Sequence, residues 1–332
     1  MKNDSLPKIF LLFLITAFSC NNGEKKGTDS ADSFRFEEYT ITQLQQGYDN
    51  SEFTVTDVVQ AYLDRIAQID DEGPVLNAVI RVNPDALTIA AQLDAELRDG
   101  KKRGPMHGVP VLLKDNIDTH DQMETTAGSR ALTGSHPLQD SYIAIKLREA
   151  GAVIIGKANL SEWANFRGNL SSSGWSGVGG QTKNPYVLDR NPCGSSSGSG
   201  VAVSANLTMI AIGTETNGSI VCPATANGIV GIKPTVGLLS RSGIVPISFT
   251  QDTPGPMGKT VSDAAAALGA MTGIDPNDSK TAASEGKYLT DYTTFLKEGG
   301  LKGKRLGWYT AARGAHFKVD TLMQHAVDFL KS

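Results

Sequence analysis

The sequence contains few residues that bind metals or cross-link small domains. Its 332 residues include three cysteines and five histidines, and the histidines show no zinc-binding spacing such as HExxH. Cys193 and Cys222 stand in the body of the chain. Two cysteines are too few for a disulfide scaffold, so we expect both to be small buried side chains. The sequence predicts no metal site.

The sequence also has no block of charge of one sign. It carries 31 Lys and Arg against 35 Asp and Glu, a net charge of −4. Proteins that bind nucleic acids concentrate basic residues in a patch or stripe. We therefore expect no nucleic-acid partner. The content of 40% hydrophobic and 20% charged residues is typical of a globular protein, and one large α/β domain would fit the length.

The first apolar run, IFLLFLITAF at residues 9–18, is too short to cross a membrane as a helix. It follows Lys2 and Lys8 and ends at Ser19 and Cys20. This arrangement resembles a bacterial lipoprotein signal peptide, in which the cysteine receives a lipid. A plain secretory signal is the alternative.

A polar stretch, NNGEKKGTDSADS, follows Cys20 and favours the lipoprotein interpretation. We therefore predict a signal peptide over residues 1–19 and a polar tether over residues 20–35. The protein would be exported and held on the periplasmic side of a bacterial membrane through a lipid on Cys20.

Helices alternate with short, continuously apolar runs in the rest of the chain. One predicted helix begins with a capping box of Thr54 and Asp57, and another has Asn83 as N-cap and Gly100 as its stop. Apolar runs without polar alternation indicate strands that are buried on both faces, hence an α/β fold. We predict helices at residues 54–66, 83–100, 141–151 and 200–210, and strands at 109–113, 152–160, 209–215, 228–234 and 304–310.

The stretch CGSSSGSG, residues 193–200, has the composition of a linker but is flanked by predicted core elements. It lacks the lysine of a phosphate-binding loop and the third glycine of a dinucleotide-binding turn, so no nucleotide cofactor is expected. A second small-residue turn, TETNGSIVCPA, follows at residues 214–224. Consecutive N–H groups in such a turn can form an oxyanion hole, and Ser219 stands where a nucleophile would be needed.

A nucleophilic serine needs a base, and neither turn contains a histidine. Lys114, at the end of an apolar run, could be this base if burial keeps it neutral. An ion pair between Lys114 and Asp115 or another acid is equally compatible with its position.

Four motifs, in this order, resemble those of the amidase signature family: GVPVLLKDN, NPCGSSSGSG, GTETNGSIVCPA and GIKPTVGLLSRSGIVPISFTQDTPGP. The resemblance extends from about Phe36 to the end, so we assign residues 36–332 to one domain of this family. It implies a mixed β-sheet covered by helices on both faces and catalysis without a cofactor. It also implies that Lys114 is the base, Ser195 a relay serine after a cis peptide bond, and Ser219 the nucleophile.

The same resemblance implies an oxyanion hole and an acyl-enzyme mechanism. Lys114 would accept a proton from Ser195, which deprotonates Ser219. The oxyanion hole would consist of the backbone N–H groups of Thr216, Asn217, Gly218 and Ser219. The sequence differs from the family pattern at two positions outside the triad: Asn217 replaces the usual Asp of bacterial relatives, and Lys259 replaces the more usual Arg. The segments at 125–129 and 174–185 also match the family and are expected to shape the pocket.

The resulting expectation is an exported amidase that hydrolyses a small-molecule or peptide carboxamide to an acid and ammonia or an amine. One alternative is the glutaminase (A) subunit of a tRNA-dependent amidotransferase, against which the export signal argues. Another is a non-catalytic lipoprotein of the same fold, against which the intact triad argues. Family members continue past the amphipathic helix expected at residues 319–330, so we expect a domain truncated at its C-terminal end.

Overall fold

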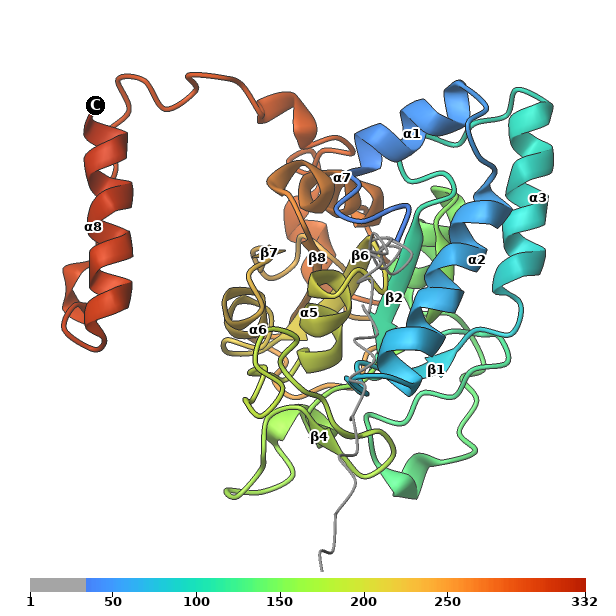
Figure 1. The fold of residues 1–332 in the computed structure, drawn as a ribbon, viewed down its shortest axis with the longest axis horizontal. Helices are drawn as coiled ribbons and strands as arrows, with labels where there is room; N and C mark the ends of the chain where they lie inside the picture. The colour runs from blue at the N-terminus through green and yellow to red at the C-terminus, as the bar shows by residue number, and fades with distance from the viewer. Residues whose placement is uncertain (1–33) are drawn as a thin grey trace, which may run out of the picture.

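The computed structural model describes residues 34–332 and is built around a mixed six-stranded sheet (Figure 1). The predicted signal peptide and Cys20 lie outside the described residues. The strand order is β1-β3-β2-β6-β8-β7. These strands are β1 (Val79–Val82), β2 (Pro110–Lys114), β3 (Val153–Ala158), β6 (Ile210–Glu215), β7 (Val230–Gly231) and β8 (Thr253–Gly258). A separate two-stranded ribbon contains β4 (Trp175–Ser176) and β5 (Gly180–Gln181).

The centre of the sheet is parallel and its margins are antiparallel. Strand β2 pairs in parallel with both β3 and β6, whereas β1, β8 and β7 join as antiparallel strands. Every residue of β2, β3, β6 and β8 is buried, which explains why the first three read as apolar runs. Parallel strands end at the same edge, so Lys114 and Glu215 come to one side of the sheet.

Helices flank the sheet, as predicted. In Figure 1, α2 and α5 lie in front of the strands, while α4 and α7 pack on each other and contact β3 and β8 respectively. No helix within residues 34–332 is long and apolar enough to span a membrane. The helices are α1 (Ile41–Asp49), α2 (Val55–Ile66), α3 (Ala86–Arg98), α4 (Tyr142–Glu149), α5 (Ser197–Ser204), α6 (Val221–Ala226), α7 (Val261–Met271) and α8 (Phe317–Lys331).

The predicted N-terminal cap is correct for α2 and wrong for α3. The capping box of α2 is present: Asp57 N donates to Thr54 Oγ1 at 3.0 Å, and Thr54 N donates to Asp57 Oδ2 at 2.8 Å. Asn83 is not the N-cap of α3, which begins only at Ala86. Its Nδ2 donates to Ile154 O and its Oδ1 accepts from Asp85 N, so Asn83 closes a turn against β3 instead.

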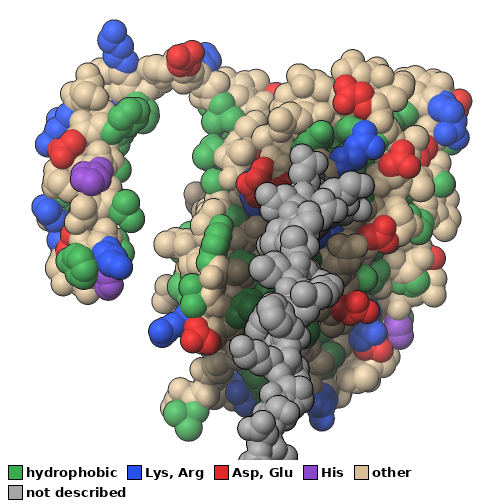
Figure 2. All heavy atoms as spheres, viewed as in Figure 1, with side chains coloured by type: hydrophobic (Ala, Val, Ile, Leu, Met, Phe, Trp, Pro, Cys, Tyr) green, Lys and Arg blue, Asp and Glu red, His purple; other side chains and the backbone are tan. Residues whose placement is uncertain are grey.

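The predicted strand at residues 304–310 is also wrong. This segment is irregular, and Leu306 and Tyr309 are exposed. A short apolar run forms a strand only where a sheet edge can pair with it, and within residues 34–332 no strand pairs with this one. The expected amphipathic helix forms as α8, which stands apart from the sheet (Figure 1). Its apolar side chains, visible as green spheres in Figure 2, are exposed: Phe317, Val319, Leu322, Met323, Phe329 and Leu330.

Candidate active site

Three segments far apart in the sequence meet where β2 and β6 end. Lys114 Nζ lies 2.7 Å from Ser195 Oγ, at the start of the turn that leads into α5. The next residue, Ser196, donates its backbone N–H to Ser219 O at 3.1 Å, which joins this turn to the turn after β6. The structure therefore brings together the three predicted catalytic residues.

Lys114 is fully buried, and this burial lowers its pKa from 10.5 to about 7 against the opposing effect of Glu215 and Asp252. Besides Ser195, its Nζ contacts Thr214 Oγ1 at 2.9 Å and Thr214 O at 3.2 Å. A neutral amine offers two N–H bonds and one lone pair. The two Thr214 oxygens can accept the N–H bonds, and the lone pair can accept the Ser195 hydroxyl proton.

The alternative ion pair of Lys114 is absent from the described part of the chain. The Asp115 carboxylate accepts hydrogen bonds from Thr126 N at 3.2 Å, from Thr126 Oγ1 and from Gly128 N at 3.3 Å. Burial raises the pKa of Asp115. Asp115 thus holds the segment at residues 125–129 in place and forms no ion pair with Lys114.

A second buried lysine, Lys157, lies on the neighbouring strand β3. Its Nζ donates to Ile117 O at 2.5 Å and to Thr125 Oγ1 at 2.9 Å. Burial lowers the pKa of Lys157 from 10.5 to about 8, and the charge of Asp115 opposes this shift. Lys157 therefore supports the loop after β2 and makes no hydrogen bond to Ser195 or Ser219.

Ser195, the predicted relay serine, lies in a tightly packed turn. The Gly194–Ser195 peptide bond is cis, as the resemblance implies. Ser195 O accepts the backbone N–H of Ser161 at 3.0 Å. A Cβ at Gly194 would lie 2.4 Å from Ser161 Oγ, and one at Gly198 would lie 2.2 Å from the Ala78 carbonyl oxygen. No side chain larger than hydrogen fits at Gly194 or Gly198. The glycines of this stretch therefore allow close packing and do not form a flexible linker.

The turn that carries Ser219, the predicted nucleophile, is organised by Glu215, which the sequence reasoning missed. Its carboxylate accepts the backbone N–H groups of Gly218 at 2.8 Å, Ile220 at 2.7 Å and Val221 at 3.0 Å. Gly218 has a φ of +80°, in the left-handed region that favours glycine. One buried carboxylate therefore fixes the path of the chain around Ser219.

The predicted oxyanion hole needs one correction. The N–H of Gly218 is bonded to Glu215, so it is not free to hold an oxyanion. Within residues 34–332, no acceptor is bonded to the N–H groups of Thr216, Asn217 or Ser219. The Ser219 side chain likewise makes no hydrogen bond to a described residue. The hydroxyls of Ser195 and Ser219 do not form a hydrogen bond with each other. Hydrogen bonds between catalytic groups often tighten only when substrate binds.

The two cysteines are not separate buried side chains, as expected, but form a disulfide with a Cα–Cα distance of 5.9 Å. Cys193 stands just before the cis bond, and Cys222, which is exposed, lies in α6 after Ser219. The disulfide therefore ties together the turns that carry Ser195 and Ser219. The prediction failed because a spacing of 29 residues does not reveal that the two turns are neighbours.

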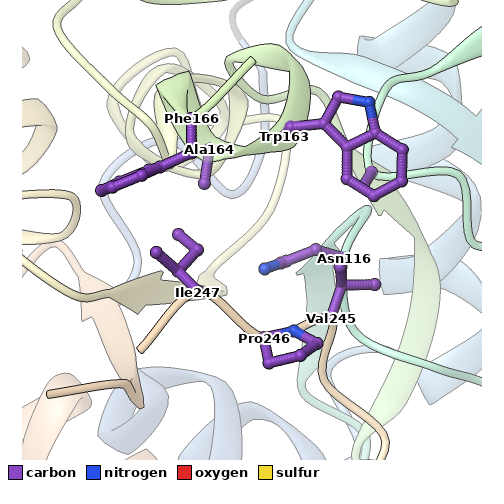
Figure 3. Close-up of a pocket in the computed structure, with 8 residues that line it drawn as sticks. Asn116, Trp163, Ala164, Phe166, Val245, Pro246 and Ile247 are labelled. Carbon is purple, nitrogen blue, oxygen red and sulfur yellow. The ribbon is translucent and has the colours of Figure 1, made fainter. Parts of the chain in front are cut away.

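A cavity of about 280 Å³ lies beside the loop that follows Lys114 (Figure 3). Asn116 connects it to the lysine, because Asn116 Nδ2 donates at 3.0 Å to Thr214 Oγ1, which Lys114 also contacts. Among the described residues, no group of three or more His, Cys, Asp or Glu side chains could hold a metal ion. The cavity is lined by Asn116, Ala127, Trp163, Ala164, Phe166, Val245, Pro246 and Ile247.

Comparison with known proteins shows the family of this chain. The family model named Amidase matches residues 57–332. The chain belongs to the amidase family. Its mixed sheet and flanking helices are those of solved family members. The peptide amidase from Stenotrophomonas maltophilia is 54% identical, with a TM-score of 0.85 over 90% of this chain and 61% of that one.

Two curated relatives carry different names. A protein of Arabidopsis thaliana named "Probable amidase" is 49% identical over 300 residues, which cover 90% of this chain and 58% of the relative. The glutamyl-tRNA(Gln) amidotransferase (A) subunit of Alkaliphilus metalliredigens is 41% identical over 274 residues, 82% of this chain and 53% of the relative. The chain thus spans little more than half the length of these relatives.

Proposed function

We propose that this member of the amidase family hydrolyses the C–N bond of a carboxamide to give a carboxylate and ammonia or an amine. The observation that carries the proposal is the buried Lys114, whose Nζ lies 2.7 Å from Ser195 Oγ beside the Ser219 turn. Burial lowers the pKa of this lysine to about 7, so a large fraction is neutral at physiological pH.

In the proposed mechanism, neutral Lys114 accepts the proton of Ser195, which in turn takes the proton of Ser219. Ser219 Oγ bonds to the carbonyl carbon, and the carbonyl electron pair moves onto the oxygen. The N–H groups of Thr216, Asn217 and Ser219 stabilise this oxyanion. When the C–N bond breaks, Ser195 returns a proton to the leaving nitrogen. Water, deprotonated through the same relay, then releases the acid from Ser219.

The test is ammonia release from a panel of simple amides, peptide amides and glutamine. We expect the wild-type protein to release ammonia, and the Ser219→Ala variant to release none above background. Ser172→Ala, which changes an exposed loop serine, is the matched control. An inactive wild type that is folded, or an unaffected Ser219→Ala variant, would contradict the proposal.

We favour a small-molecule or peptide amide as the substrate. Similarity to the peptide amidase supports this choice, since its 54% identity exceeds the 41% shared with the amidotransferase relative. Turnover of glutamine in preference to peptide amides would instead favour the amidotransferase alternative. A non-catalytic lipoprotein of this fold would turn over no amide at all.

We also propose that the protein is exported and anchored by a lipid on Cys20 on the periplasmic side of the membrane. The short apolar run before Cys20 supports this location. The Cys193–Cys222 disulfide supports it independently, because disulfides persist mainly in oxidising compartments. Labelled fatty acid should be incorporated by the wild type and not by Cys20→Ser. Equal membrane fractionation of both forms would disprove the anchor.

A further inference from the structure

Asp252 joins the turn that carries Ser219 to the loop that precedes β8. Its Oδ1 accepts the hydroxyl of Thr216 at 2.5 Å. Its Oδ2 accepts the backbone N–H groups of Ile247 and Ser248, both at 2.8 Å. This half-buried carboxylate therefore uses both of its oxygens, and each oxygen holds a different segment of the chain.

The register of the sheet explains why Asp252 and Thr216 meet. Strands β6 and β8 are antiparallel, and the pairing ends with Glu215 opposite Thr253. In an antiparallel pair, the residue after one partner lies opposite the residue before the other. Thr216 and Asp252 hold these two positions, so their side chains meet just beyond the end of β6, where the turn that carries Ser219 begins.

The two segments that Asp252 holds belong to different parts of the site. Thr216 has one of the backbone N–H groups that have no acceptor in the described part of the chain and could hold an oxyanion. Ile247 lines the cavity shown in Figure 3. Its segment is also held to the loop after β2, because Val245 N donates to Asn116 O at 2.9 Å. Asp252 therefore fixes the N–H of Thr216 relative to this cavity wall.

The negative charge of Asp252 also acts on Lys114. Burial lowers the pKa of this lysine to about 7, and the charges of Glu215 and Asp252 oppose the shift. A cavity of about 10 Å³ lies between Thr214, Thr216 and Asp252, and it has room for about one water molecule. Thr214 Oγ1 in turn contacts Lys114 Nζ at 2.9 Å. Little water can therefore screen the carboxylate from the lysine.

Other charged side chains near this pair are bonded to different groups. Arg241 lines the same small cavity, and its Nε donates to Asp278 Oδ2 at 2.8 Å. The carboxylate of Asp115 accepts hydrogen bonds from the loop after β2. Within residues 34–332, the carboxylates whose charge favours protonation of the lysine at the end of β2 are therefore those of Glu215 and Asp252.

From these contacts we infer that Asp252 is a positioning residue for amide hydrolysis and acts in two ways. Its carboxylate holds Thr216 so that the backbone N–H can bond the oxyanion, and its charge stabilises the protonated form of Lys114 that the reaction creates. This inference rests on the proposed function and adds a residue to it. Asp252 acts through Thr216 and Lys114 and does not itself bond the substrate.

Asp252→Asn tests the charge. Its amide oxygen can accept the two backbone N–H groups while its amide N–H donates to Thr216 Oγ1, so both links can remain. Protonated Lys114 then loses a stabilising charge and releases its proton at a lower pH. We expect the acid limb of kcat/KM to move to lower pH by about half a unit or more. Asp99→Asn, which removes the same charge from an exposed position, should leave the limb unchanged.

Thr216→Val tests the link alone. Valine resembles threonine in shape but cannot donate to Asp252, whose charge remains. We expect kcat to fall by about tenfold or more with KM unchanged, because the oxyanion forms only in the reaction. The acid limb should stay where it is in the wild type. Thr133→Val, at an exposed position, is the control and should keep the wild-type kcat.

The assay for all variants is ammonia release from the peptide amide that the wild type hydrolyses fastest, with circular dichroism as the control for folding. An unmoved acid limb in folded Asp252→Asn, or a wild-type kcat in Thr216→Val, would overturn the inference without contradicting amide hydrolysis. If Asp252→Asn does not fold, the kcat of Thr216→Val decides. Hydrolysis of no amide by the wild type would overturn the proposed function and this inference with it.

Discussion

Lys114 Nζ and Ser195 Oγ lie 2.7 Å apart although 81 positions separate the two residues in the chain. Both side chains are fully buried, so no bulk water competes for the proton that they share. The lysine reaches this position because β2 and β6 are parallel neighbours that end at the same edge. The sheet topology therefore determines where the Lys114 side chain ends, beside the turn that carries Ser195.

The rate of amide hydrolysis should fall as the pH falls through about 7. Burial lowers the pKa of Lys114 to about 7, and below this value the lysine is protonated and cannot accept the proton of Ser195. kcat/KM measured from pH 5 to 9 should rise about tenfold per pH unit on the acid side and then level off. Circular dichroism at each pH serves as the control for folding. A flat profile between about pH 5 and 7 would exclude a lysine base with this pKa.

Labelling with a fluorophosphonate probe should depend on Ser219. The side chain of this serine has no hydrogen-bond partner in the described residues, where the backbone N–H groups of Thr216, Asn217 and Ser219 likewise have no acceptor. We expect covalent labelling of the wild type and of Ser172→Ala, and none of Ser219→Ala, as measured by intact-protein mass. Labelling of Ser219→Ala at the wild-type rate would place the nucleophile elsewhere.

Glu215→Gln should lower both stability and kcat. The carboxylate accepts three backbone N–H groups of the nucleophile turn, and a glutamine amide would present N–H bonds to some of these donors. We expect kcat to fall by about tenfold or more, and the free energy of unfolding to fall by about 1–3 kcal/mol. Glu285→Gln, at an exposed position, is the control. Full activity of Glu215→Gln would show that the turn keeps its shape without the carboxylate.

Reduction of the Cys193–Cys222 disulfide should destabilise the protein by about 3–4 kcal/mol, the value for a closed loop of this length. Denaturant unfolding with and without reductant measures the difference. The double variant Cys193→Ser with Cys222→Ser should match the reduced wild type and should not respond to reductant. Equal midpoints for the oxidised and reduced wild type would show that the disulfide adds nothing to stability.

The sequence was sufficient to predict the central strands, and the three residues predicted to be catalytic come together in the structure. β2, β3 and β6 are buried on both faces and so appear as apolar runs. In contrast, β8 has the sequence TPGPMG, whose prolines and glycines do not favour a strand. It forms because β6 offers an edge with which it pairs over its whole length. Elements that depend on a distant partner were the ones missed.

The same distinction applies within the site. Lys114, Ser195 and Ser219 stand in recognisable motifs, but the contacts of Glu215 depend on neighbours that only the fold supplies. The disulfide and the engaged N–H of Gly218 were missed for the same reason. The residue type shows which bonds a group can form. Only the fold shows whether a neighbouring group already occupies it, as with the Gly218 N–H and the two cysteines.

The two buried lysines make folding itself a proton-releasing reaction. Lys114 and Lys157 have pKa values of about 7 and 8 in the folded protein, against 10.5 ordinarily. Between about pH 8 and 10 the unfolded chain keeps protons that the folded chain has lost, so the free energy of unfolding rises with pH across this window. Below about pH 7 both states are protonated and the contribution is constant and unfavourable. The unfolding heat measured near about pH 9 will therefore include the ionisation enthalpy of the buffer that supplies those protons.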